Sequence, residues 1–383
     1  MNMTRRTALL GLGATGLTAC GSGGGGLGPR ATKPVDTGLP DDLKPVPNAD
    51  YDAWVSSFRA RAGAKGITPA TLNAGFRGAG YLPGVVKRDR NQVEFSRTLE
   101  DYLAIAASGE RVTKGRAAFA RHRATLNAIE ARYGVAPEIV TAIWGLESYY
   151  GERRGNVPVI SATSTLAFDG RRGKFFEGQL VAALKILQTG DTTPANLKGS
   201  WAGAMGHTQF IPTSYQAFAV DFTGDGRRDI WSEDPSDSLA STAAYLSRNG
   251  WTRGLKWGGE AGSGVSGRAI QPQAGGPTFN VTSNFNAIKR YNNSDSYAIG
   301  IGHLADRIAG GGPIRGTFPP DKYGMVKRER IQLQQRLTAK GYDTGGTSGV
   351  IGPKSRQAIT DYQSSIGLPA TGDPSRDLLA RLG

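Results

Sequence analysis

Glu147 is the residue whose type and position most strongly suggest catalysis. The segment Pro137–Tyr150 begins with proline and carries apolar residues three or four positions apart, which predicts a helix. Glu147 flanks the apolar stripe of this helix, and no lysine or arginine lies near it at helical spacing. The stripe consists of Ile139, Ile143, Leu146 and Tyr150. Apolar surroundings raise the pKa of a carboxyl group, and a carboxyl that is protonated near pH 7 can act as a general acid toward a glycosidic oxygen. The alternative is an amphipathic glutamate at the edge of a core.

A second group of candidate residues lies in the segment 198–215, which is rich in glycine and alanine. Small residues let the backbone approach a ligand or a neighbouring helix closely, and Ser200, Gln209 and Tyr215 supply hydrogen-bonding groups. The Gln209 amide could donate to and accept from the N-acetyl group of an amino sugar, and Ser200 could orient the acid. Taken alone, the segment favours close packing of a helical hairpin, whereas Glu147 upstream favours a sugar site.

The composition limits the class of protein. The chain has 383 residues, 38% of them hydrophobic, which suits a soluble globular protein with one sizeable domain and a small one. Its 46 basic residues give a formal net charge of +14, but they form no long basic run or nucleic-acid motif, so nucleic-acid binding is not expected. An anionic cell-surface polymer or simple solubility explains the charge. Cys20 is the only cysteine, which excludes a disulfide framework within one chain.

The N-terminus has the pattern of an export signal over residues 1–19. Arg5 and Arg6 precede an apolar stretch too short to span a bilayer, and small residues lead up to Cys20. This resembles a bacterial lipobox, in which Cys20 would become the lipidated first residue of the mature protein and anchor it to a membrane. An ordinary cleaved signal with a chance cysteine is the alternative, and export would follow the Sec or the twin-arginine route. Residues 20–47, rich in glycine and proline, are predicted to form a disordered tether.

Helical spacing dominates the remainder of the chain. It extends from residue 51 to about 134 and returns at 176–188, 238–248 and 298–308. Between about 250 and 290, glycine and short alternating runs predict a small β-rich insertion. Glycines and prolines over 311–325 indicate a linker before a last periodic segment at 326–383.

Several motifs occur in a fixed order along the chain. They are Gly134-Val-Ala-Pro-Glu-Ile-Val, Gly145-Leu-Glu-Ser, Lys198-Gly-Ser-Trp-Ala-Gly-Ala-Met-Gly with Gln209-Phe and Pro212, Tyr215 with Ala219-Val-Asp-Phe and Gly224-Asp-Gly, and Arg290-Tyr-Asn-Asn-Ser with Tyr297. Together they resemble the membrane-bound lytic murein transglycosylase B family over about residues 50–310. The resemblance implies a mainly α (α+β) fold, with a lysozyme-like helical catalytic domain over residues 48–310.

The resemblance also implies a reaction. Such enzymes cleave the β-1,4 bond between N-acetylmuramic acid and N-acetylglucosamine in peptidoglycan, and the muramyl C6 hydroxyl, not water, attacks the anomeric carbon to leave a 1,6-anhydro end. Glu147 would protonate the leaving oxygen and then, as a base, deprotonate that hydroxyl. Hydrolysing glycosidases use two carboxyl groups, and none near Glu147 in sequence stands out as a partner, although Asp169 or Asp191 could fold nearby.

The motif matches assign further roles to polar and apolar residues of the second group. Ser200 and Gln209 would position the substrate, while Met205 and Phe210 would line the sugar groove. The basic pair Arg171–Arg172 matches one in the family that could meet carboxylates of the stem peptide, and a solvated loop is the alternative there.

Five more residues are assigned around the acid. Tyr291 and Asn292 resemble ligands of the substrate and of the acid's surroundings, and Tyr297 a wall of the site. Tyr102 and Tyr245 match groove aromatics less distinctively. Aromatic faces stack on sugar rings, but a tyrosine at helical spacing is as often part of the core.

The segment Asp221–Asp229 has oxygen-bearing residues at loop positions one, three and five and glycine at six, as at the start of a calcium loop. Position twelve is Ser232, which cannot supply a bidentate carboxylate, but the family's loop is closed by a later aspartate, here Asp234 or Asp237. The ligand set predicted from this pattern is Asp221, Thr223, Asp225, Arg227 and Asp237. A bound Ca²⁺ would be structural, and catalysis would require no cofactor. An Asp-Gly turn held by Asx hydrogen bonds is the alternative.

Residues 326–383 resemble a peptidoglycan-binding-like domain of three helices. The small core of such a bundle would need Leu333, Leu337, Ile351, Ile359 and Leu368. Ser348 and Ser355 stand where that family often has aspartate and threonine. The expected role of this domain is to raise the local concentration of the enzyme on the polymer.

The resulting hypothesis is a monomeric periplasmic lipoprotein that acts on peptidoglycan glycan strands. It would be anchored through Cys20, to the outer membrane. A non-catalytic peptidoglycan-binding or scaffolding lipoprotein and a hydrolytic muramidase are the alternatives.

Overall fold

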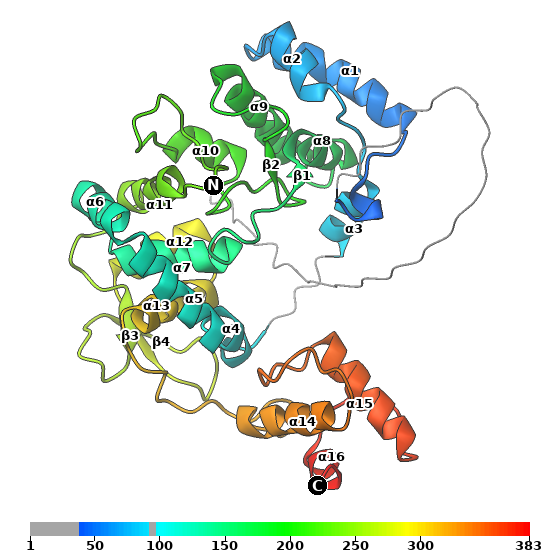
Figure 1. The fold of residues 1–383 in the computed structure, drawn as a ribbon, viewed down its shortest axis with the longest axis vertical. Helices are drawn as coiled ribbons and strands as arrows, with labels where there is room; N and C mark the ends of the chain where they lie inside the picture. Colours follow the sequence, from blue (N-terminus) through cyan, green and yellow to red (C-terminus); the bar gives the residue numbers. More distant parts are fainter. Residues whose placement is uncertain (1–37, 92–96) are drawn as a thin grey trace. The chain divides into compact units, whose positions relative to one another are not determined.

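Sixteen α-helices and two small antiparallel sheets make up the computed structural model, which describes residues 38–91 and 97–383 (Figure 1). The predicted mainly α (α+β) class is confirmed. The export signal, Cys20 and residues 20–37 of the predicted tether lie outside the described residues. Within the described part, every helix is too short or too polar to cross a bilayer.

The described chain divides into two units. The first contains the residues up to 91, together with 155–204 and 211–213, and the second contains 97–154, 205–210 and 214–383. Helix α10 (Pro212–Phe218) begins in the first unit and continues into the second.

The first unit is built around α8 (Val159–Asp169), in which every residue from Val159 to Ala167 is buried. Such a helix must be covered on all sides. It contacts α9, α1, α2 and α3. Their bounds are Gly173–Thr189, Ala49–Ala64, Pro69–Phe76 and Pro83–Arg90. Strand β1 (Val157–Pro158) pairs antiparallel with β2 (Lys198–Gly199).

The tether prediction is wrong for the stretch from residue 39 to 46. A 3₁₀-helix η1 (Asp41–Leu43) forms there, and Leu39 and Leu43 are each only 6% exposed in the core of the first unit. The Val46 amide also donates to the Tyr81 carbonyl at 2.9 Å. Proline content suggested disorder, but two leucines placed four residues apart bury enough apolar surface to hold the segment.

The second unit centres on α7 (Pro137–Ser148) and α13 (Asp295–Ile308), which pack against each other. Residues Ile139 to Gly145 of α7 are all buried. The surrounding helices are α4 (Leu99–Ala106), α5 (Gly109–Arg121), α6 (Arg123–Tyr133), α11 (Ser236–Arg248) and α12 (Ser283–Tyr291). The predicted helical stretches are therefore confirmed.

A three-stranded antiparallel sheet confirms the predicted β-rich insertion. Its strands are β3 (Gly258–Glu260), β4 (Arg268–Ile270) and β5 (Phe279–Val281), in the order β3-β5-β4. Gly258 and Arg268 both lie opposite Val281. The insertion ends earlier than predicted, because α12 begins at Ser283.

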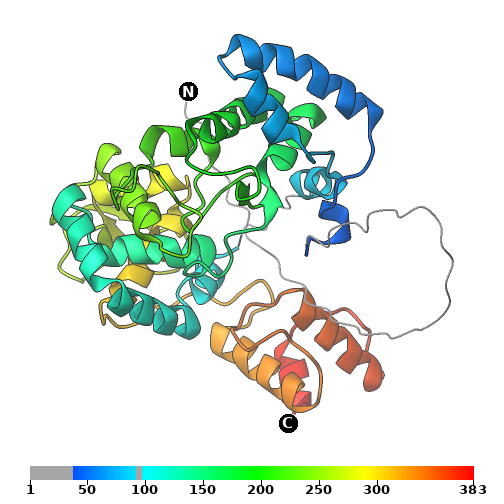
Figure 2. The same ribbon diagram turned by 45° about the horizontal axis from the view of Figure 1, so that its top comes forward.

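The C-terminal domain is a bundle of α14 (Lys327–Ala339), α15 (Pro353–Ser365) and α16 (Arg376–Arg381), shown in orange to red in Figure 2. Leu333, Leu337 and Ile359 are fully buried, and Ile351 and Leu368 pack against them, as predicted. Met325, the last residue of the predicted linker, is also fully buried in this core. The domain therefore begins one residue earlier than predicted.

Candidate active site

Glu147 lies in the last turn of α7, which ends at Ser148. Tyr149 and Tyr150 follow with φ of 56° and 61°, a left-handed conformation that non-glycine residues seldom adopt. Tyr150 therefore leaves the apolar stripe on which it was predicted. Gly151 continues the turn, and its amide donates to the Ser148 hydroxyl at 3.0 Å. This sharp ending leaves Glu147 half-buried at the end of the helix.

Tyr297 of α13 donates a hydrogen bond from its phenol to Oε1 of Glu147, at 2.7 Å. The Tyr297 ring is only 1% exposed, and burial, followed by the Glu147 charge, raises the pKa of its phenol well above the ordinary value. The phenol therefore stays protonated and remains a donor. Tyr102 of α4 is half-buried and packs against Gly300 of α13, three residues after Tyr297, and its pKa is raised by burial and then by the charge of Glu147. The structure thus brings Tyr102, Glu147 and Tyr297 together.

Gln209 lies in a tight loop that Met205 and Phe210 close by exchanging backbone hydrogen bonds at 2.8 and 3.0 Å. Its backbone is left-handed, with φ of 54°. The side-chain nitrogen donates to the Arg154 and Gly206 carbonyls, both at 2.9 Å. Both amide hydrogens are used in these bonds, so the amide oxygen is the atom suited to a ligand. The expectation that Gln209 both donates and accepts is corrected to acceptance alone.

Several predicted groove residues are buried beneath the loop. Met205 and Phe210 are 0% exposed, so the prediction that they line an open groove is wrong. Tyr245 is 6% exposed, donates to the Arg290 carbonyl at 2.5 Å and packs its ring against Phe210, which places it in the core. These buried side chains therefore pack inside the protein and stabilise the loop that carries Gln209.

Tyr291 and Asn292, from the motif at 290–294, have mostly structural positions. Tyr291 is 2% exposed and donates to the Thr208 carbonyl at 2.5 Å, so its hydroxyl holds the loop that carries Gln209. This buried position corrects the prediction that Tyr291 binds the substrate directly. Asn292 is half-buried at the C-cap of α12, where its carbonyl accepts from the Ser294 amide at 2.7 Å.

His207 is a further residue of the site, to which the sequence motifs assign no role. Its Nδ1 accepts from the Trp144 indole at 3.1 Å, and its Nε2 contacts the Ser232 carbonyl at 2.7 Å, which assigns the proton to Nε2. The Ser148 hydroxyl donates to the His207 carbonyl. His207 therefore ties the end of α7 to the loop of Gln209. A histidine in a variable motif position carries no sequence signal for this role, which arises only from tertiary packing.

Ser200 belongs to the first unit, where it shapes a tight loop. Its hydroxyl accepts from the Ala204 amide at 3.1 Å, and its own amide donates to the Ala204 carbonyl at 2.7 Å. The side chain is half-buried. Substrate positioning by Ser200 stays a prediction.

The basic pair of the first unit has an internal partner. Arg171 forms a fork on Asp89, with Nε–Oδ2 and Nη2–Oδ1 distances of 2.5 and 2.6 Å, and Arg172 approaches the same carboxylate at 3.4 Å. Asp89 is 1% exposed, so the arginines compensate a buried charge. In the same unit Asp169 pairs with Arg90, and Asp191 accepts from Thr189.

The predicted calcium loop brings three carboxylates together. Ligand oxygens of Asp221, Asp225 and Asp237 lie within 4.8 Å of one another. Asp237 is 3% exposed and accepts from the Phe222, Thr223 and Asp229 amides. Burial, partly offset by these amides, raises the pKa of the Asp237 carboxyl.

The structure also decides which of two aspartates closes this loop. The carboxylate of Asp234 accepts from the amide and hydroxyl of Ser236, the first residue of α11. Asp237, the other sequence alternative, meets the carboxylates of Asp221 and Asp225.

Comparisons with known proteins agree on both parts of the chain. The transglycosylase SLT domain family matches residues 50–269 and 262–306. The putative peptidoglycan binding domain family matches residues 327–382. Membrane-bound lytic murein transglycosylase B of Escherichia coli K12 is 40% identical over 146 residues, which are 38% of this chain and 40% of that relative's length.

Solved structures extend the similarity. SltB3 from Pseudomonas aeruginosa, crystallised with NAG-anhNAM-pentapeptide, is 43% identical, with 88% of this chain and 100% of that chain covered and a TM-score of 0.69. The Escherichia coli lytic transglycosylase Slt35 in complex with calcium is 27% identical, with 68% and 93% covered and a TM-score of 0.58.

Replacing His207 should reveal its structural role. His207→Phe should lower the free energy of unfolding by about 1–3 kcal/mol at pH 7.5, because the Trp144 indole and the Ser232 carbonyl lose their buried partner. Urea denaturation followed by circular dichroism measures this change.

The pH dependence should change as well. Burial lowers the pKa of His207 below 6.5, so the folded chain takes up this proton less readily than the unfolded chain. The stabilising contribution is fully present above about pH 6.5 and is lost as the pH falls further. Between pH 7.5 and 5.5 the wild type should therefore lose more stability than His207→Phe. An equal loss in the two proteins would show that His207 is not buried in its neutral form.

Proposed function

We propose, from the premise that this chain belongs to the transglycosylase SLT domain family, that it is a lytic murein transglycosylase acting on peptidoglycan. The observation that carries the proposal is the 2.7 Å hydrogen bond from the buried Tyr297 phenol to the half-buried Glu147. It holds one carboxyl group in a defined position at the end of a buried helix. The matching peptidoglycan-binding domain family at 327–382 supports the same polymer as substrate.

Glu147 would act first as an acid and then as a base. Its proton passes to the glycosidic oxygen as the bond between that oxygen and the muramyl anomeric carbon breaks. The resulting carboxylate then takes the proton of the muramyl C6 hydroxyl, whose oxygen bonds to the anomeric carbon. Glu147 ends protonated, as it began, and the product carries a 1,6-anhydro end. The phenol of Tyr297 stabilises the ionised form between the two steps.

Substrate positioning would fall to groups around the acid. The Gln209 amide oxygen can accept from the N–H of an N-acetyl group, and the half-buried Tyr102 can pack its ring on a sugar face. Ser200 would also position the substrate, as the family motif implies. The SltB3 complex contains a NAG-anhNAM-pentapeptide, which supports a saccharide of this kind as a ligand here.

The cellular placement is part of the same proposal. Cys20 would carry a lipid after export, and the protein would act as a monomer in the periplasm on the outer membrane. Residues 48–310 would form the catalytic domain and 326–383 the binding domain. A membrane-bound relative supports a place in the cell envelope.

The loop of Asp221, Asp225 and Asp237 fits a structural Ca²⁺. The three carboxylates converge, and carboxylate oxygens are ligands that Ca²⁺ prefers. Thr223 and Arg227 of the predicted ligand set would add a hydroxyl and a carbonyl oxygen. The calcium complex of Slt35 supports this proposal. The ion would stabilise the loop between α10 and α11 and take no part in the reaction.

Glu147→Gln should abolish cleavage of purified sacculi, with a rate loss of about 10²–10⁴-fold, because the amide can neither give nor accept the proton. Mass spectrometry of the products measures both rate and chemistry. The wild type should release anhydro ends. Binding of the variant to sacculi, measured by sedimentation, should be retained.

The matched control is Glu138→Gln, which makes the same change in the first turn of the same helix. This control should cleave normally. Reducing ends from the wild type would favour a hydrolytic muramidase, and binding without cleavage would favour a scaffolding lipoprotein. An active Glu147→Gln protein would remove Glu147 from the mechanism.

Tyr297→Phe should lower the cleavage rate roughly tenfold and move the alkaline limb of the pH–rate profile to higher pH. The phenol favours the ionised carboxylate, so without it the acid retains its proton longer as the pH rises. Tyr245→Phe removes a buried phenol whose bond goes to the Arg290 carbonyl, and it should leave that limb in place. A limb that shifts in neither protein, or equally in both, contradicts the role of Tyr297.

Calcium should raise the melting temperature of the wild type by a few degrees relative to EGTA. At a hundredfold excess over Kd, binding contributes about 2.7 kcal/mol to stability. Asp225→Asn/Asp237→Asn should lose this shift, because two of the three convergent carboxylates are gone. Asp234→Asn, whose carboxylate accepts from Ser236, should keep it. Differential scanning calorimetry with and without EGTA measures the shift, and its absence in the wild type would refute the site.

A further inference from the structure

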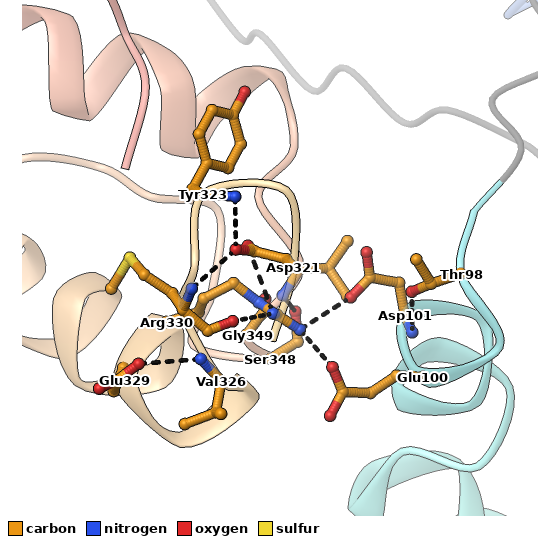
Figure 3. Close-up of polar contacts among 12 residues, drawn as sticks. Thr98, Glu100, Asp101, Asp321, Tyr323, Val326, Glu329, Arg330, Ser348 and Gly349 are labelled. Carbon is orange, nitrogen blue, oxygen red and sulfur yellow. Dashed lines mark hydrogen bonds and ion pairs between the residues drawn. The ribbon is translucent and has the colours of Figure 1, made fainter. Parts of the chain in front are cut away.

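Arg330 of the C-terminal domain is a buried cation with partners in two domains (Figure 3). Its side chain is 3% exposed. Within its own domain Nε donates to the Gly349 carbonyl at 2.7 Å and Nη1 to the Met325 carbonyl at 3.0 Å. Asp321, just before the domain, lies 3.3 Å from Nη1. These contacts fix the guanidinium group in one orientation.

The remaining nitrogen of Arg330 points out of its domain toward α4 of the catalytic domain (Figure 3). Nη2 donates to Glu100 Oε2 at 2.6 Å and to Asp101 Oδ1 at 3.2 Å. The two carboxylate side chains are only 11% and 26% exposed. Burial raises the pKa of Asp101, and the charge of Arg330 is the largest influence that opposes this. Without Arg330, both acids would lie partly buried without this partner, which is costly.

The connection between the domains is held as well. Glu260 of β3 accepts from the amides of Arg315 and Gly316, at 2.9 and 2.5 Å. Asp321 accepts from the amides of Tyr323 and Met325, both at 2.9 Å. The segment between α13 and α14 therefore has fixed contacts at both ends. A freely moving linker would leave these amides to water.

We propose that Arg330 locks the peptidoglycan-binding domain onto α4, so that this domain is a fixed part of the catalytic unit and not a module on a flexible tether. The same helix packs against α13, which carries Tyr297, and its Tyr102 contacts Gly300 of α13. A glycan strand held by the C-terminal domain is thereby presented to the acid in one orientation. This second consequence rests on the proposed function, whereas the docking itself does not. Arg330 is a positioning residue in this arrangement.

The docking is tested in the full chain with Glu100→Gln/Asp101→Asn. This variant leaves the bonds of Arg330 inside its own domain in place, so the small domain should stay folded. Hydrogen exchange measured by mass spectrometry should quicken at least roughly tenfold in α4 and in residues 311–325, a factor that corresponds to about 1.4 kcal/mol. Exchange in the core helices α7 and α15 should not change.

The matched control is Asp50→Asn/Asp52→Asn, which removes two acids from the first turn of α1, where both are exposed. It changes net charge and helix dipole in the same way but should leave exchange in α4 and 311–325 unaltered. Unchanged exchange in Glu100→Gln/Asp101→Asn, or an equal increase in the control, would overturn the docking.

Digestion of sacculi tests the functional consequence. The rate for Glu100→Gln/Asp101→Asn should fall severalfold, while the control keeps the wild-type rate. If exchange quickens but the sacculus rate is unchanged, the strand-presenting role is wrong. If the wild type itself releases no fragments, the proposed function fails, and the exchange experiment still decides the docking.

Discussion

The hydrogen bond between Tyr297 and Glu147 is the interaction on which the site depends. It joins residues 150 positions apart in the chain. It can form only if α7 and α13 pack side by side, and it lasts only while the phenol is protonated, which burial ensures. The bond fixes the Glu147 carboxylate at the end of α7, and this fixed position is the premise of the proposed acid–base role. The surrounding core therefore keeps α7 and α13 packed in the position that this hydrogen bond requires.

The backbone strain of the site is explained by the same requirement. Tyr149, Tyr150 and Gln209 are the non-glycine residues with positive φ in the described chain. The first two end α7 directly after Glu147, and the third lies in the loop that Met205 and Phe210 close. Such backbone conformations cost free energy, and they persist where surrounding contacts stabilise them. His207 supplies much of that support through Trp144 and Ser148.

The predictions that succeeded rest on local signals. Proline at position 137 and regular apolar spacing predicted α7, and the core of the C-terminal bundle followed from its leucines and isoleucines. The errors have a common physical origin, since burial is set by distant residues. Leu39 and Leu43 find a core that lies far along the chain, and Met205 and Phe210 turn inward beneath their loop. Neither outcome is encoded within a short window of sequence.

The arginine–carboxylate pairs extend this argument. Arg171 belongs to the pair predicted to meet carboxylates of the stem peptide, yet this exposed side chain binds the buried Asp89. Arg330 is itself buried and binds Glu100 and Asp101. A guanidinium group presents several donors in a rigid plane, so it can hold a carboxylate and nearby carbonyls together. Removing such an arginine would leave a buried carboxylate without a compensating positive charge, which is costly. Each pair therefore holds together the elements that carry its two members. In this chain such arginines therefore join elements that lie far apart in the sequence.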